Sequence, residues 1–302
     1  MPIGAEQRLE LECPAKVNLT LDVLERRPED GYHYIRSVMV PISLCDRLIL
    51  EPAPEGITLE CTPAVTGRVE ENLAYRAAVL LREATGYPGG VRIRLEKAIP
   101  VAGGLAGGST DAAGVLLGLN RLWGTRLTRE ELIRLAVRLG SDVPFFIVGR
   151  PARVEGVGER VTPVPAARPL WLVVTTPPVA KSTGKVYELF DQLPSVPFRP
   201  DAAAVEAALA EGDPVGVARG LCNVFEAVML PRHPEIARLK EALLAEGALG
   251  AVMSGAGPTV FGLVPDEVAG AALLDRIRPL ARGAWLTRCA AAPSAACGAD
   301  SC

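Results

Sequence analysis

A dense cluster of glycines constrains this chain more than any other feature. Four glycines fall within six residues of the segment Pro100-Val101-Ala102-Gly103-Gly104-Leu105-Ala106-Gly107-Gly108-Ser109-Thr110, between a strand pattern at 91–96 and an Ala/Leu-rich helix pattern. Glycine lets backbone N–H groups approach a ligand closely, and a helix N-terminus adds unpaired donors and partial positive charge. The segment therefore predicts a phosphate-binding loop. Ser109 and Thr110 stand where a hydroxyl can cap the helix, bind a phosphate oxygen or contact a metal ion.

Two better-known phosphate motifs do not fit this loop. No lysine follows the glycines, which excludes a P-loop. No Gly-x-Gly follows the strand in register and a proline stands at the junction, so a dinucleotide-binding fingerprint fits poorly. The structural alternative is a flexible loop that ends in an ordinary helix cap. So many glycines are costly in chain entropy unless a ligand uses them, which favours the phosphate site.

The composition is that of a globular protein without a basic surface. The chain has 302 residues, which suggests about two domains at roughly 150 residues each. Hydrophobic residues make up 49% and the formal net charge is -3, which argues against proteins that coat nucleic acid or an anionic membrane.

Cysteine usage and the termini predict a cytoplasmic location. The seven cysteines are odd in number and show no zinc-ligand spacing, which suggests reduced thiols. The N-terminal residues lack the basic start and apolar stretch of a signal peptide, and no segment approaches about 18 uninterrupted apolar residues. We therefore expect neither a membrane nor a nucleic acid as a partner.

Local patterns outline the elements. Strand-like runs at 16–25, 37–44 and 46–51 precede a helix that Asn72 caps and Gly86 ends. Thr128 and Glu131 form a capping box for a helix that we expect Gly140 to end. The proline-rich segment 163–169 is the predicted domain junction, and the second half follows a β-α-β-β-α-β order with extra helices inserted.

Several motifs together resemble the GHMP kinases. Besides the loop, the segments PAKVNL at 14–19 and SGAGPT at 254–259 agree with that superfamily's pattern. Within it, PAKVNLTLDV, DGYHY, LGSDVPFF, EGVGE and MSGAGPTVF are most similar to the kinases of 4-diphosphocytidyl-2-C-methyl-D-erythritol, over about residues 10–290.

The resemblance implies an α+β, two-domain GHMP kinase fold. It places an N-terminal ribosomal-protein-like α/β domain at 1–163 and a C-terminal ferredoxin-like α+β domain at 164–290, with the active site in the cleft between them. We expect the small, polar residues 291–302 to form a disordered tail.

The implied reaction is the ATP-dependent phosphorylation of the substrate's 2-hydroxyl group. The resemblance makes Lys16 and Asp142 the catalytic pair: Asp142 would accept the hydroxyl proton or hold the hydroxyl in line, and Lys16 would stabilise the developing negative charge. Each has a plainer interpretation on its own. Lys16 fits a surface-facing strand position, and Asp142 fits a helix cap or turn.

On the ATP side, the implied binding residues are Pro100, Gly103, Gly104, Leu105, Ala106, Gly107, Gly108, Ser109 and Thr110, with Asn72 and Lys97 lining the adenine side. Mg2+ follows from ATP chemistry, because no all-carboxylate metal site is evident. Ala106 departs from the family loop, which commonly has glycine there. If the backbone needs a positive φ at this position, alanine would cost about 1 kcal/mol.

The implied small-molecule substrate carries a cytidine diphosphate group. The resemblance assigns its recognition to Asn18, Tyr32, His33, Thr183 and Tyr187, with the two tyrosines sandwiching the cytosine and His33 hydrogen-bonding it. Without the resemblance, Tyr32 and His33 fit equally well a hairpin turn with exposed aromatic rings.

Three alternatives stay open. The chain could be a GHMP kinase for another small alcohol, such as mevalonate, homoserine or a sugar, although the aromatic set speaks against that. It could be a non-catalytic nucleotide-binding regulator, which retention of Lys16 and Asp142 disfavours. A nucleic-acid-binding module is disfavoured by the acidic pI near 5.7. We expect a monomer or weak homodimer.

Overall fold

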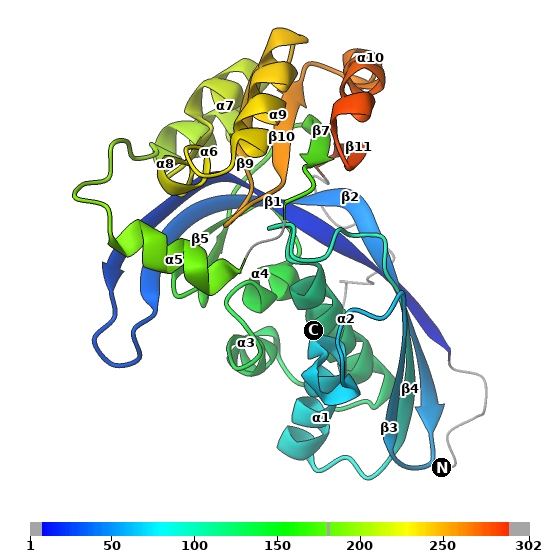
Figure 1. Cartoon of the computed structure of the whole chain (residues 1–302). Helices are drawn as coiled ribbons and strands as arrows, with labels where there is room; N and C mark the ends of the chain where they lie inside the picture. Colours follow the sequence, from blue (N-terminus) through cyan, green and yellow to red (C-terminus); the bar gives the residue numbers. More distant parts are fainter. Residues whose placement is uncertain (1–7, 180–181, 290–302) are drawn as a thin grey trace.

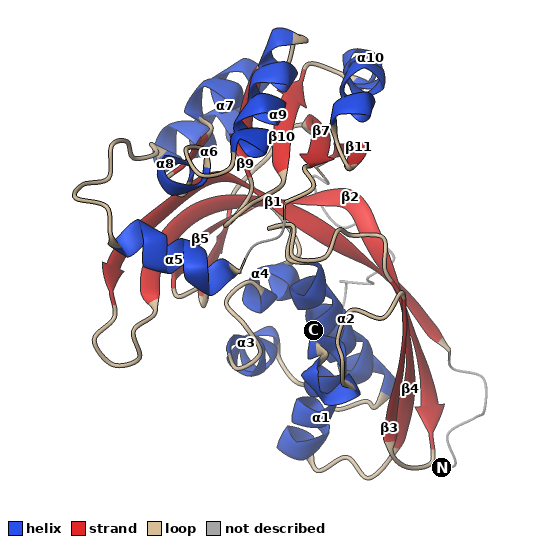
Figure 2. Ribbon diagram, in the orientation of Figure 1, coloured by secondary structure: helices blue, strands red, loops and turns tan. Residues whose placement is uncertain are grey.

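The computed structural model describes residues 8–179 and 182–289. Helices α1–α4 lie on one side of a long, curved strand pair, and most of the second half lies on the other (Figures 1 and 2). The predicted tail, 291–302, falls outside the described residues. Within the described part of the chain, no helix is long and apolar enough to cross a membrane.

The first sheet has seven strands in the order β3-β4-β2-β1-β8, with β5 paired to β2 and β6 paired to β5. The strands are β1 (Leu9–Arg26), β2 (His33–Ala53), β3 (Ile57–Thr62), β4 (Gly90–Glu96), β5 (Ala152–Gly156), β6 (Arg160–Pro163) and β8 (Cys222–Asn223). The two runs predicted at 37–44 and 46–51 are one continuous strand, β2, so the predicted division was wrong. Neighbouring strands hold β2 together, since β1, β4 and β5 all pair along its length.

Both faces of β1 are buried in the middle of the molecule. Ala15, Val17 and Leu19 point to one face and are fully buried. Lys16 and Asn18 alternate with them and are 3% and 1% exposed. Because successive strand residues point to opposite faces, both faces here are covered. The plainer interpretation of Lys16 as a surface position is therefore wrong.

Four helices cover one face of this sheet: α1 (Leu73–Thr85), α2 (Gly107–Leu122), α3 (Arg129–Val137) and α4 (Val143–Val148), and a short 3-10 turn, η1 (Val69–Glu71), precedes α1. The predicted ends of α1 are confirmed: the Asn72 side chain accepts a hydrogen bond from Ala74, and Gly86 is left-handed. The capping box of α3 is also confirmed. That helix ends at Val137 rather than at Gly140, because tighter bonds such as Leu139 N–H to the Ala136 carbonyl close its last turn.

The second sheet confirms the predicted β-α-β-β-α-β order. Its strands are β7 (Trp171–Thr176), β9 (Gly250–Met253), β10 (Val260–Val264) and β11 (Gly283–Arg288), in the antiparallel order β11-β7-β10-β9. Its two crossing helices are α9 (Pro234–Ala245) and α10 (Glu267–Ile277), which η2 (Arg278–Leu280) follows. The inserted helices are α5 (Thr183–Asp191), α6 (Ala202–Glu211), α7 (Pro214–Gly220) and α8 (Glu226–Met229).

The two sheets share a hydrophobic core. Val17 and Leu19 of β1 belong to one buried cluster with Leu172, Val174 and Phe261 of the second sheet. The two-residue strand β8, which the sequence did not reveal, adds a further link, because it pairs with β1 although it lies in the second half. The domain boundary at 163/164 stays a prediction; β6 ends at Pro163 and β7 begins at Trp171.

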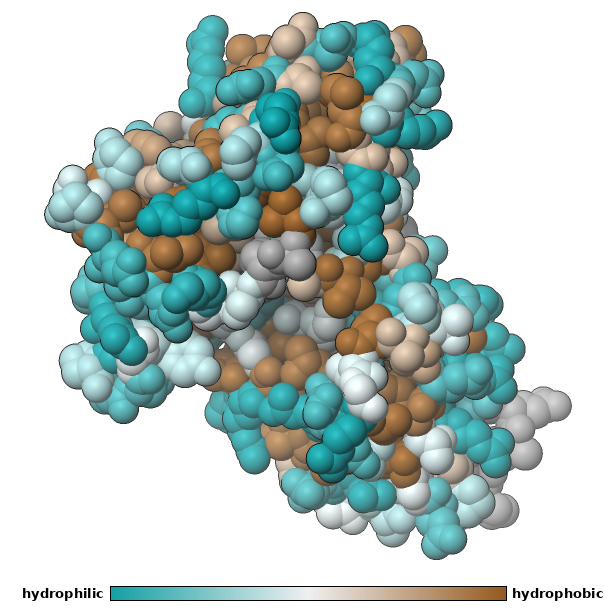
Figure 3. All heavy atoms as spheres, in the orientation of Figure 1, coloured by the Kyte–Doolittle hydropathy of each residue, from teal (hydrophilic) through white to brown (hydrophobic). Residues whose placement is uncertain are grey.

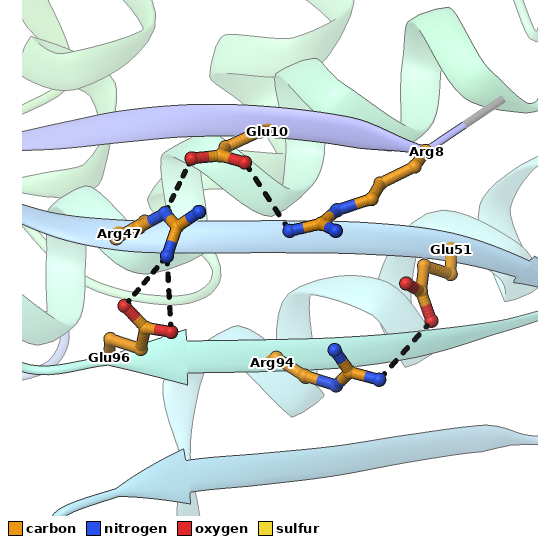
Figure 4. A network of polar contacts seen from close by, with 6 residues as sticks. All are labelled: Arg8, Glu10, Arg47, Glu51, Arg94 and Glu96. Atoms are coloured by element: carbon orange, nitrogen blue, oxygen red, sulfur yellow. Dashed lines mark hydrogen bonds and ion pairs between the residues drawn. The ribbon is translucent and has the colours of Figure 1, made fainter.

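A ladder of exposed ion pairs runs across β1, β2 and β4 at the open end of the first sheet (Figure 4). Arg47 lies between Glu10 at 2.5 Å and Glu96 at 3.2 Å, and Arg8 is 3.4 Å from Glu10. Exposed pairs of this kind are screened by solvent and contribute little to stability. Their main effect is to keep this sheet face polar.

A buried ion triad holds both ends of the glycine loop. The Lys97 ammonium, just before the loop, contacts the carboxylates of Asp46 and Asp111, and the distance to Asp111 Oδ2 is 2.5 Å. The other oxygen of Asp46 accepts hydrogen bonds from the amides of Ala98 and Ile99. Since Asp111 lies near the start of α2, the triad fixes where the loop begins and where it ends.

The triad carries one more carboxylate than cation. Asp111 Oδ1 is buried without a hydrogen-bond partner. Burial raises the pKa of Asp111 to about 7; the Lys97 charge opposes this rise and the Asp46 charge adds to it. Near neutral pH, Asp111 therefore changes charge inside the fold.

This raised pKa predicts a pH-dependent stability. The folded protein binds the Asp111 proton more tightly than the unfolded chain, whose pKa is about 3.9, so the resulting stabilisation is lost as pH rises through about 7. Relative to Asp111→Asn, the wild type should lose about 2 kcal/mol of unfolding free energy between roughly pH 5 and pH 8. Urea unfolding of both proteins measures the difference. Asp213→Asn, the same change at an exposed helix cap, is the control; parallel pH profiles for wild type and Asp111→Asn would contradict the prediction.

The loop itself contains backbone strain. Ala106 has a φ of 58° and Ala102 a φ of 56°, both in the left-handed region. Position 106 thus has a positive φ, which is the condition under which alanine was expected to cost stability.

Replacing Ala106 with glycine should stabilise the protein by about 1 kcal/mol, because glycine adopts this conformation without a Cβ clash. The matched control is Ala207→Gly in the exposed middle of α6, where the same substitution should destabilise by about 1 kcal/mol. Thermal and urea unfolding give both values. Two changes of the same sign would be inconsistent with strain at Ala106.

Candidate active site

A cavity of about 470 Å³ lies where the glycine loop meets the second half of the chain. Figure 3 shows the surface hollowed between the two halves of the molecule. The lining includes most of the predicted loop together with Lys16, Asn72, Lys97, Asp142, Thr183 and Gly255. Residues from six separate parts of the sequence therefore meet around one cavity.

The N-terminus of α2 opens into this cavity. Gly107 and Gly108 line the cavity and begin the helix, and no side chain caps it. Its first amide groups and its partial positive charge are thus directed toward the space that a ligand would occupy. Two predicted loop residues do not line the cavity: Leu105 is fully buried in the core, and Thr110 is 2% exposed inside α2.

Asn72 and Lys97 both line the cavity, but each already has protein partners. The Asn72 side chain caps α1, and the Lys97 ammonium belongs to the buried triad. These hydrogen bonds and ion pairs explain the positions of both side chains. The placement of the two residues beside adenine stays a prediction.

Lys16 is held rigidly at the floor of the cavity. Its Nζ donates to Asn18 Oδ1 at 2.6 Å and to the Gly104 carbonyl at 3.1 Å. An ammonium has three donors, so one remains for a ligand. Burial lowers the pKa of Lys16, and the negative charge of Asp142 acts in the opposite direction.

Asp142 faces the same cavity from the start of α4. It occupies the N-cap position, yet its side chain makes no capping hydrogen bond, so the helix-cap interpretation does not account for the carboxylate. Every residue of α4 itself is buried, which gives Asp142 a rigid base. No ion pair joins Asp142 to Lys16 among the described residues, and the two charges face each other across the cavity lining.

The predicted substrate residues divide into two groups. Asn18 is buried between Lys16 and Ser37, to whose Oγ it donates at 2.9 Å, and it is absent from the cavity lining. It thus orients Lys16. Thr183 lines the cavity at the start of α5, and Tyr187 follows one turn later on the same helix face.

His33 packs directly against Tyr187. Their ring centroids are 5.1 Å apart with an interplanar angle of 28°, and His33 Nε2 lies 2.7 Å from Asp191 Oδ1. Tyr32 is 65% exposed on the β1–β2 turn. In this structure one face of Tyr187 is therefore taken by His33, and a base stacked between the two tyrosines would require these rings to move.

Tyr187 also lies within electrostatic reach of Asp142. Burial raises the pKa of Tyr187, and the Asp142 charge adds to that rise. The order of groups along the site is thus the glycine loop, then Lys16 and Asp142, then the aromatic pair.

Sequence reasoning missed the contacts that join the two halves. Ser254 Oγ donates to the Gly104 carbonyl at 3.0 Å. The buried Asn223 amide holds the turn after β9 by donating to the carbonyls of Met253 and Gly255. The motif at 254–259 was recognisable in the sequence and could have indicated the contact of Ser254 with Gly104. Nothing local marks Asn223, because a two-residue strand has no pattern.

No group of three or more His, Cys, Asp or Glu side chains within the described ranges is arranged to hold a metal ion.

Comparison with known proteins identifies the family. Residues 72–150 match the GHMP kinases N terminal domain, and residues 205–279 match the GHMP kinases C terminal domain. A 4-diphosphocytidyl-2-C-methyl-D-erythritol kinase of Symbiobacterium thermophilum is 73% identical over 280 residues, which cover 93% of this chain and 99% of that protein. One of Pelotomaculum thermopropionicum is 48% identical over 254 residues, 83% of this chain and 88% of that protein.

Solved structures agree. A crystal structure of 4-(cytidine 5'-diphospho)-2C-methyl-D-erythritol kinase superposes with a TM-score of 0.81 at 39% identity, covering 93% of this chain and all of that chain. A homoserine kinase from Cytophaga hutchinsonii shares the fold, with a TM-score of 0.73 at 18% identity, covering 96% of this chain and 97% of that chain. The cavity, its glycine loop and these relationships lead to one conclusion: the chain belongs to the GHMP kinases and, among them, to the 4-diphosphocytidyl-2-C-methyl-D-erythritol kinase family.

Proposed function

We propose that this protein transfers the γ-phosphoryl group of ATP to the 2-hydroxyl group of 4-diphosphocytidyl-2-C-methyl-D-erythritol. The observation that carries the proposal is the shared cavity of Lys16, Asp142 and the uncapped N-terminus of α2. Phosphoryl transfer depends mainly on positioning and on stabilisation of negative charge. One cavity with a phosphate cradle, a cation and a carboxylate supplies both.

The glycine loop would hold the ATP phosphates. The amides at the start of α2 and the close backbone approach at Gly107 suit a phosphate chain. Mg2+ fits this donor set, since the Ser109 hydroxyl lines the cavity and would hold the ion alongside the phosphates. When bound, the ion would neutralise phosphate charge.

Asp142 would accept the proton of the attacking hydroxyl group, or hold that hydroxyl in line. Lys16 would place its remaining N–H on the negative charge that develops during transfer. Its fixed bonds to Asn18 and Gly104 mean that little reorganisation is needed when that charge appears. Asn18 therefore acts through Lys16.

The cytidine diphosphate group would extend from the cavity along α5. Thr183 lines the cavity, and Tyr187 and His33 lie farther along the same path. Aromatic rings at that end provide stacking for a base, which is worth on the order of 1–3 kcal/mol.

The direct test incubates the protein with Mg-ATP and each of several acceptor alcohols, and measures the release of ADP. The alcohols are 4-diphosphocytidyl-2-C-methyl-D-erythritol, mevalonate, homoserine and galactose. We expect turnover only with the cytidine-containing alcohol. Turnover of another alcohol would overturn the substrate assignment, and ATP binding without turnover of any alcohol would point to a regulator.

Asp142→Asn should lower kcat by about 10²- to 10⁴-fold, because the amide cannot take up a proton. The fold should be unaffected, since the Asp142 side chain caps nothing. Steady-state kinetics and ATP binding by calorimetry separate the two effects. Asp213→Asn, at a helix cap remote from the cavity, should retain wild-type kcat; equal activity of the two variants would remove Asp142 from the mechanism.

Lys16→Met should lower kcat by about 10²- to 10³-fold without loss of stability. The pKa of Lys16 is lowered in the folded state, so its protonated form destabilises the fold, and this penalty disappears as pH rises toward the ordinary value of 10.5. The unfolding free energy of the wild type should therefore rise relative to Lys16→Met as pH increases into that range. Urea unfolding at several alkaline pH values measures this; a falling difference would contradict the burial argument.

A further inference from the structure

The end of α5 carries a carboxylate that the proposed reaction does not use. Asp191 is the last residue of that helix, and its Oδ1 lies 2.7 Å from Nε2 of His33. The His33 side chain is 8% exposed, whereas that of Asp191 is 40% exposed. The imidazole is thus fixed from one edge by Asp191 and on one face by Tyr187.

Tyr187 is itself held in place. Its ring packs edge-on against the buried Phe225, with centroids 4.8 Å apart and an interplanar angle of 81°. The stack of His33 on Tyr187 therefore rests on the core of the second half, with the Nε2 edge of the imidazole toward Asp191.

The contact with Asp191 determines which nitrogen of a neutral His33 carries the proton. A carboxylate only accepts hydrogen bonds, so Nε2 must be the N–H donor. In a neutral imidazole the other nitrogen, Nδ1, is then an acceptor. No protein group in the described part of the chain bonds to Nδ1, which leaves its lone pair available to a ligand.

We propose that Asp191 is a positioning residue that fixes the tautomer of His33 and thereby makes the site select cytosine over uracil. This inference rests on the proposed function, in which His33 meets the base of the cytidine diphosphate group. Cytosine presents an amino group at position 4, a donor that matches the Nδ1 acceptor. Uracil presents a carbonyl oxygen there, an acceptor that leaves both partners unpaired.

An unpaired group at such a contact corresponds to about 10- to 100-fold in affinity. For uracil to bind well, His33 would have to move its proton to Nδ1, and Nε2 would then turn a lone pair toward the Asp191 carboxylate. The repulsion between these two acceptors opposes the change. Asp191 thus excludes uracil without touching it.

The first test compares the binding of CDP and UDP by calorimetry in the wild type, Asp191→Ala and Asp191→Asn. The wild type should prefer CDP by at least about 10-fold. Asp191→Ala should reduce that preference to roughly 3-fold or less by improving UDP binding, and Asp191→Asn should weaken it as well, because the amide can turn its NH2 group to Nε2 and so accommodate either tautomer. An undiminished CDP preference in Asp191→Ala would overturn the proposal.

The control variant is Glu188→Gln. Glu188 lies on the same helix and pairs with Lys185 at 2.9 Å on the surface, without contact to His33. It should keep the wild-type preference. A loss of preference there equal to that in Asp191→Ala would mean that the charge of α5 acts in general, and would also overturn the proposal.

A second measurement reports the tautomer directly. The chain has only two histidines, so His233→Gln leaves His33 as the single imidazole signal in 15N NMR. At alkaline pH, His33 should keep its proton on Nε2 with either CDP or UDP bound. In Asp191→Ala, bound UDP should draw the proton to Nδ1, an effect that a merely structural role would not produce. The same Nε2–H form in that complex would contradict the assignment.

Turnover separates this inference from the proposed function. If the wild type does not phosphorylate 4-diphosphocytidyl-2-C-methyl-D-erythritol, the proposed function fails whatever the base preference. If it does, and Asp191→Ala still prefers CDP as strongly as the wild type, only the role of Asp191 fails.

Discussion

The carbonyl oxygen of Gly104 accepts hydrogen bonds from both halves of the molecule, from Lys16 Nζ at 3.1 Å and from Ser254 Oγ at 3.0 Å. The neighbouring carbonyl of Gly103 accepts from the amide of Thr259. Glycine is required at 104, because its φ is 81° and a Cβ would lie 2.3 Å from the Ser254 carbonyl oxygen. The glycine loop, the Lys16 ammonium and the second sheet therefore share one hydrogen-bonded junction.

The site holds its charges at the expense of stability. Lys16 is buried with a lowered pKa, and Asp111 behind the loop is buried with a raised one. Ala106 adds backbone strain in the same loop. Strain and buried charge of this kind commonly collect where a protein binds and reacts, because a preorganised site needs them there. The shared core between the sheets, formed around Val17, Leu172 and Phe261, supplies the rigidity that keeps them in place.

Local signals in the sequence predicted the elements but not the contacts between them. The caps at Asn72 and Thr128, the glycine loop and the β-α-β-β-α-β succession of elements in the second half each follow from neighbouring residues. The triad does not, because Asp46 lies 51 residues from Lys97 and its role depends on how β2 and β4 pair. The His33–Asp191 contact spans 158 residues and arises only when α5 folds against the β1–β2 hairpin. The resemblance to a family predicted that Lys16 and Asp142 act as a pair. Only the structure shows that Lys16 is buried and which groups its ammonium bonds.

In the proposed mechanism, one cavity holds the phosphate donor and the acceptor hydroxyl in line, with Asp142 and Lys16 on either side. A crystal structure with a non-hydrolysable ATP analogue and 4-diphosphocytidyl-2-C-methyl-D-erythritol tests it most directly. We expect the 2-hydroxyl group within hydrogen-bonding distance of the Asp142 carboxylate, facing the γ-phosphate, with Lys16 beside it and the cytosine near His33. A hydroxyl group bound away from Asp142, or a phosphate chain outside the glycine loop, would contradict this mechanism.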